Sequence, residues 1–87
     1  MSLEHTETTQ LLRLRVSAEA DPGLLARLLG YFHNLNVVPH RIVAEFATTQ
    51  LMHIQVDVSG LSERRLTLIA AKVHQWVPVA HAYWHWL

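Results

Sequence analysis

Seven histidines are the most unusual feature of this 87-residue sequence. Imidazole is a common metal ligand, and two histidines four residues apart on a helix can share one zinc ion. His81 and His85 have this spacing. The preceding Pro78 favours a strand instead, which would place the two side chains about 13 Å apart. We therefore expect surface histidines and no metal site within the chain, while a site built across a dimer stays open. Ligand spacing is also absent for His33, His40, His53 and His74.

Nucleophilic catalysis has no support in the sequence. Ser17, Ser59 and Ser62 lie at predicted strand or helix-cap positions, and none has the surrounding residues of a nucleophile elbow. We therefore expect no catalytic residues, no enzyme activity and no cofactor bound by this chain.

The composition limits the classes of partner. Seven Lys and Arg residues balance seven Asp and Glu residues, and the pI is about 7.1, so no basic field would attract nucleic acid or an anionic membrane. There are no cysteines, and no apolar run reaches the roughly 18 residues of a membrane span. The polar start at Met1–His5 lacks the apolar region of a signal peptide, so we expect a cytoplasmic protein.

The hydrophobic pattern predicts four strands and two helices. Apolar and polar residues alternate in the segments that we interpret as strands, which are 11–18, 37–47, 51–58 and 79–84. Asp21 and Pro22 are typical of a helix start, and Asn36 suits the left-handed residue after a helix. Ser62 is a good cap for the second helix. The predicted apolar stripes are Leu24, Leu25, Leu28, Leu29 and Phe32 in the first helix, and Leu66, Ile69, Ala70 and Val73 in the second.

The element order β-α-β-β-α-β predicts an α+β fold of the ferredoxin-like class, a four-stranded antiparallel sheet with two helices on one face. In this topology the second and fourth strands lie at the edges. Pro39 and Pro78 fall at the starts of these two strands, where a missing backbone donor is tolerated. We expect a polar N-terminal arm over residues 1–10 and a single domain over 11–87.

Residues 14–30 (LRVSAEADPGLLARLLG) resemble the first strand, loop and helix of an ACT domain, including its Pro-Gly-hydrophobic-hydrophobic stretch at Pro22–Leu25. Residues 76–82 (WVPVAHA) are similar to the last strand of the short small subunits of acetohydroxyacid (acetolactate) synthase, isozyme II type. ACT domains are regulatory modules that commonly pair side by side through edge elements. The resemblance therefore implies a homodimer and a large catalytic subunit as partner, which itself carries thiamine diphosphate, FAD and magnesium.

The resemblance also implies an effector loop between the first strand and the first helix, at Ala20, Asp21, Pro22, Gly23 and Leu24. A helix N-terminus there offers N–H groups to the carboxylate of a small amino acid. Amino-acid-binding members usually carry Asn where this chain has Ala20, and Asp21 adds a negative charge beside that position. Both changes weaken the case for a bound amino acid.

The C-terminal segment places Tyr83, Trp84 and Trp86 within four residues. Alternation on a strand prevents all three rings from facing the core, so we expect them to form a protein interface. Trp76 is expected to complete the core instead. The open-face positions of the central strands hold no aromatic residue, which argues against base stacking on RNA. Three hypotheses remain: a small subunit that activates or stabilises acetohydroxyacid synthase in branched-chain amino-acid biosynthesis, a stand-alone amino-acid sensor, and a structural oligomerisation domain.

Overall fold

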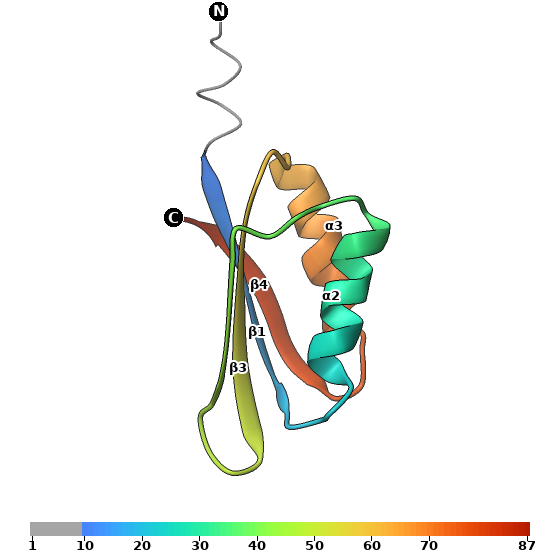
Figure 1. Cartoon of the computed structure of the whole chain (residues 1–87), viewed down its shortest axis with the longest axis vertical. Coiled ribbons are helices and arrows are strands. Elements are labelled where there is room, and N and C mark those ends of the chain that lie inside the picture. Colours follow the sequence, from blue (N-terminus) through green and yellow to red (C-terminus); the bar gives the residue numbers. More distant parts are fainter. Residues whose placement is uncertain (1–9) are drawn as a thin grey trace, which may run out of the picture.

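The computed structural model describes residues 10–87. The strands are β1 (Leu11–Glu19), β2 (Arg41–Phe46), β3 (Leu51–Ser59) and β4 (Val79–Trp86), and the helices are α2 (Leu24–Asn34) and α3 (Glu63–His74). Figure 1 shows both helices on one side of the sheet. The predicted ferredoxin-like class is therefore confirmed. The predicted arm falls almost entirely outside the described residues.

The antiparallel sheet has the order β2-β3-β1-β4, which confirms that β2 and β4 are its edges. In β1 the even-numbered residues face the helices and are buried. The odd-numbered residues lie on the opposite surface, which we call the open face. The register places Leu14 between Val56 and Trp84, and the neighbouring Arg13 between Asp57 and His85.

The core lies between the sheet and the helices. All the residues predicted for the apolar face of α3 are buried in it. Trp76 completes the core as predicted, because only 7% of its surface is exposed. On α2 the buried stripe is narrower than predicted: Leu25 is half-buried and Leu29 is 40% exposed. The fully buried set comes from both central strands and both helices and includes Leu12, Leu14, Val16, Val56, Leu28, Phe32, Leu66 and Val73.

The helix ends match the expectation at two sites and differ at one. Asn36 has a φ of 61°, the left-handed conformation predicted after the first helix. Ser62 accepts a hydrogen bond from the Arg65 N–H and so caps α3. The prediction that Asp21 caps α2 was wrong. The helix begins at Leu24 with Gly23 in the cap position, because the Asp21 carboxylate bonds the N–H only two residues ahead.

The second strand is shorter and less covered than the pattern predicted. It begins at Arg41, after Pro39, which has no N–H to donate. Its even-numbered residues lie on the helix side of the sheet, yet only Ile42 is half-buried. Ala44 is exposed, and 67% of the Phe46 surface is accessible. The apolar alternation therefore continues beyond the area that the helices cover.

Gly30 has no packing role within the described residues. A glycine inside a helix can mark a close backbone contact, but a Cβ at this position would meet no atom within 4 Å. Gly30→Ala should therefore stabilise the fold by about 0.5–1 kcal/mol, because alanine loses less backbone entropy in a helix. Urea denaturation followed by circular dichroism would measure the unfolding free energy. A lower value for Gly30→Ala than for the wild type would contradict this prediction.

Candidate functional site

The effector loop, residues 20–24, turns the chain from β1 into α2 through its own hydrogen bonds. The Ala20 N–H donates to the Gln50 carbonyl over 2.8 Å. The Gly23 N–H donates to Asp21 Oδ2 over 3.1 Å, and the Leu24 N–H donates to the Asp21 carbonyl, also over 3.1 Å. These N–H groups are the donors that the predicted site would offer to a ligand carboxylate. Asp21 already accepts hydrogen bonds from two of them, those of Gly23 and Leu24, through a local turn rather than through a helix cap.

An open hollow of about 470 Å³ lies beside the effector loop. Its wall is mainly apolar and includes Pro22, Leu25, Phe46 and Met52. The structure thus brings the predicted loop next to the exposed end of β2. The role of Phe46 in this wall was missed from the sequence, because the pattern placed that side chain under a helix.

The three predicted interface aromatics lie along the edge strand β4 but differ in their surroundings. Trp84 is half-buried, and its Nε1–H donates to Thr67 Oγ1 over 3.0 Å. Trp86 packs edge-on against Trp84, with ring centroids 5.8 Å apart, and remains 42% exposed. Tyr83 lies on the open face and is 54% exposed. Tyr83 and Trp86 therefore present aromatic surface on both sides of this edge.

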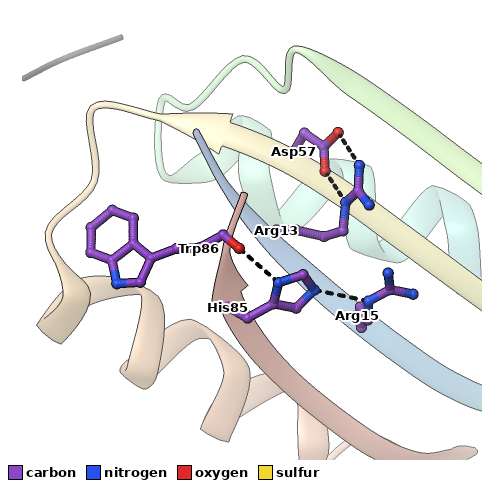
Figure 2. A network of polar contacts seen from close by, with 5 residues as sticks. All are labelled: Arg13, Arg15, Asp57, His85 and Trp86. Carbon is purple, nitrogen blue, oxygen red and sulfur yellow. Dashed lines mark hydrogen bonds and ion pairs between the residues drawn. The ribbon is translucent and has the colours of Figure 1, made fainter. Parts of the chain in front are cut away.

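The open face carries an ion pair between its two central strands. Arg13 Nε and Nη2 donate to the two carboxylate oxygens of Asp57 over 2.7 and 3.0 Å (Figure 2). The hydrogen bonds from Arg13 lower the pKa of Asp57, against the opposing effect of burial, and Arg41 and Arg15 add to the lowering. Only 4% of the Asp57 surface is exposed, so this ion pair is not an ordinary solvated surface contact.

A second polar chain runs beside this pair. Arg15 Nε donates to His85 Nε2 over 2.9 Å, and His85 Nδ1 lies 2.9 Å from the Trp86 carbonyl oxygen (Figure 2). Because Nε2 accepts and Nδ1 faces an acceptor, the geometry fits the neutral imidazole with its proton on Nδ1. His85 is thus a structural link between β1 and β4. Nothing in the sequence pattern indicated this contact.

The other described histidines are scattered over the surface. Among residues 10–87, no group of three or more His, Asp and Glu side chains is placed to hold a metal ion. His81 and His74 come from different elements, and their ring centroids are 6.4 Å apart. No described helix is long and apolar enough to cross a membrane.

Solved structures with a similar arrangement of elements include single domains and part of a longer enzyme. The ACT domain of GTP pyrophosphokinase from Chlorobium tepidum has a TM-score of 0.72 at 16% identity, with 86% of this chain and 84% of that domain covered. The C-terminal domain of the MgtC protein from Mycobacterium tuberculosis has a TM-score of 0.76 at 14% identity, with 93% and 90% covered. A homoserine dehydrogenase from Thiobacillus denitrificans has a TM-score of 0.69 at 22% identity. This chain covers only 18% of that enzyme, while 93% of this chain is matched.

Sequence comparison gives the family itself. No curated protein sequence matches the chain. Residues 5–86, nearly the whole chain, match the family described as ACT-like domain. This match agrees with the strand order β2-β3-β1-β4 and the two helices. The chain belongs to the ACT-like domain family.

Proposed function

We propose that this chain is a non-catalytic regulatory module that forms a homodimer and activates or stabilises the catalytic subunit of an acetohydroxyacid synthase. Family membership and the resemblance of residues 76–82 to the short small subunits of that enzyme support the proposal. The observation that carries it is the aromatic edge of β4. Tyr83 and Trp86 remain exposed there, on a segment from Val79 to Leu87 that contains no Asp, Glu, Lys or Arg. Exposed aromatic side chains on an uncharged edge favour a protein partner.

The module would act on the catalytic subunit by contact rather than by supplying reactive groups. Thiamine diphosphate, FAD and magnesium belong to the large subunit in this proposal. A docked β4 edge would favour the active arrangement of that subunit, because binding stabilises whichever state it contacts better.

Mixing the chain with an acetohydroxyacid synthase large subunit tests this proposal. We expect a complex whose mass exceeds that of either component and a rise in turnover of the catalytic subunit. The variants Tyr83→Ala and Trp86→Ala should each weaken the complex at least about tenfold, as truncation of interface aromatics commonly does. His33→Ala is the control, because His33 is exposed on α2 and lies away from the β4 edge. Unchanged mass and turnover on mixing would contradict the proposal.

A stand-alone amino-acid sensor is the second candidate, and the hollow beside the effector loop favours it. Titration calorimetry with valine, leucine, isoleucine and serine separates the two functions. We expect no measurable heat of binding. The backbone N–H groups of Gly23 and Leu24 already donate to Asp21, and the Ala20 side chain has no amide group to bond a ligand. Stoichiometric binding would support the sensor instead. A chain that self-associates but binds neither amino acids nor the large subunit would fit the third hypothesis, a structural oligomerisation domain.

A further inference from the structure

The open face of the sheet contains a hollow of about 190 Å³, which we call the open-face hollow. Its polar lining comes from all four strands and consists of Arg15, Ser17, Glu45, His53, Gln55 and Tyr83. These odd-numbered residues point away from the helices. The sheet therefore separates the open-face hollow from the apolar hollow beside the effector loop, which lies on the helix side.

The strand register brings four of these polar side chains together. Arg15 lies opposite Gln55, and Ser17 lies opposite His53 in the next row of the same face. Residues directly opposite each other on antiparallel strands have Cβ atoms about 4.5–5.5 Å apart, and diagonal neighbours are about 7–8 Å apart. Polar groups from β1 and β3 therefore converge on one small space between the two rows.

These four side chains have hydrogen-bonding groups that the protein does not use. Among residues 10–87, the side chains of Ser17, His53 and Gln55 form no hydrogen bond with another protein group, and Arg15 uses only its Nε. Arg15, Ser17 and Gln55 are half-buried. Polar groups that are withdrawn from bulk water and lack a protein partner are suited to bond a ligand or ordered water.

Arg15 supplies a positive charge in a fixed orientation. Its Nε donates to His85 Nε2 over 2.9 Å, so its two terminal Nη nitrogens lie on the side away from the imidazole, as Figure 2 shows. The nearby Asp57 carboxylate already accepts both hydrogen bonds from Arg13, and Arg13–Asp57 is the ion pair found in the described part of the chain. The Arg15 guanidinium can therefore bind the carboxylate of a ligand through its Nη groups.

We infer that the open-face hollow binds a small monocarboxylate that also carries a hydroxyl group. Arg15 binds the carboxylate, and Ser17 and Gln55 bond the hydroxyl, which can both donate and accept. The hollow has several times the roughly 30 Å³ that one water molecule occupies in the liquid, which suits a ligand of about six non-hydrogen atoms. This site is independent of the catalytic partner proposed above.

Glu45 restricts the charge of the ligand. It is exposed at the rim of the hollow on β2, opposite His53, and β3 lies between it and β1. Two strand spacings, about 9–10 Å, therefore separate the β1 and β2 backbones. A second carboxylate that extended toward β2 would meet a like charge. The ammonium of an α-amino acid would lie beside its own carboxylate, close to Arg15 and far from Glu45, so a hydroxyl is favoured at that position.

Proton–nitrogen correlation NMR spectroscopy of the full chain tests the inference with three matched probes. Lactate, alanine and propionate carry a hydroxyl, an ammonium or a hydrogen on the same carbon. We expect lactate to shift the backbone amide signals of Ser17, His53 and Gln55 along one saturating curve, with a roughly millimolar dissociation constant for so small a ligand. Alanine and propionate should bind at least about fivefold more weakly, because each lacks the hydroxyl.

Two variants identify the groups that bind the ligand. Arg15→Gln should weaken lactate binding at least about tenfold, because it removes the charge that holds the carboxylate. Arg41→Gln is the matched control, since it removes the same charge from an exposed position on the open face outside the hollow, and its affinity should stay within about twofold. Ser17→Ala should weaken lactate binding about fivefold and leave propionate binding unchanged. Circular dichroism would confirm that all three variants are folded.

The inference would be overturned if lactate caused no saturable shift in the millimolar range. Equal losses for Arg15→Gln and Arg41→Gln would also overturn it, because they would indicate general attraction to positive charge. Shifts confined to residues 20–24 would place binding at the effector loop and contradict the assignment to the open face. None of these results depends on the large subunit, so failure of this inference is distinguishable from failure of the proposed function.

Discussion

Trp76→Ala should be the most destabilising of the single changes considered, at about 3–5 kcal/mol of unfolding free energy. The indole follows α3 and is 7% exposed. It meets Tyr31 edge-on at a centroid distance of 5.5 Å, and the guanidinium carbon of Arg27 lies 4.3 Å from its ring centre. Tyr31 and Arg27 both belong to α2. Removal of this ring would therefore leave a cavity at the junction of the two helices and also remove a cation–π contact.

Trp86→Ala is the matched control, because the same side chain is removed from a position that is 42% exposed. We expect it to cost no more than about 1 kcal/mol. Urea denaturation followed by circular dichroism, at one protein concentration for all variants, measures both values. Folded domains are commonly stable by only about 5–15 kcal/mol, so Trp76→Ala should be much nearer to unfolding at room temperature. Equal losses for the two variants would contradict the core role of Trp76.

Asp57→Asn should lower the unfolding free energy by roughly 2 kcal/mol near neutral pH. Asn keeps the shape of the side chain but removes the charge that receives both Arg13 hydrogen bonds. Breaking a fully buried ion pair commonly costs more, roughly 3–5 kcal/mol, and we expect less here because the Arg13 side chain is still 17% exposed to solvent.

The lowered pKa of Asp57 predicts that the stabilisation by this ion pair depends on pH. Arg13 lowers the pKa of Asp57 in the folded state below its ordinary value of 3.8, so the folded chain binds that proton less readily than the unfolded chain. The stabilisation is therefore fully present above pH 3.8 and is lost as the pH falls through the folded pKa. The difference in unfolding free energy between wild type and Asp57→Asn should shrink over that range. Glu19→Gln, at an exposed position at the end of β1, is the control. If the difference in unfolding free energy between the wild type and Asp57→Asn stayed the same at every pH, this account would be contradicted.

Local patterns predicted most of the fold because they depend on residues close in sequence. Alternation in Leu12, Leu14 and Val16 identified the buried face of β1, and the left-handed Asn36 and the Ser62 cap marked helix ends. The element order then left few arrangements of four strands and two helices, so the edges could be assigned before any contact was known.

Contacts between distant residues could be predicted only in part: the element order places Arg13 near Asp57, but it indicates neither the burial of that pair nor the contact of Arg15 with His85. Arg13 and Asp57 are 44 positions apart, and Arg15 and His85 are 70 positions apart, so their pairing depends on strand register and side-chain rotamers. Several carboxylates and imidazoles could have met each arginine on the open face. Only the assembled sheet determines that Arg13 takes the buried carboxylate, that Arg15 takes an imidazole, and that Arg41 is left at the edge.

The sequence by itself determined the order and type of the elements, the faces that they bury and the ACT-like character of the first loop. The tertiary structure decided how far the helices cover the sheet. Because α3 packs along β4 and the two helices leave the end of β2 uncovered, Ala44 and Phe46 are exposed although their alternation is that of a buried face. Periodicity tells which residues share a side of a strand, whereas coverage of that side depends on the positions of other elements.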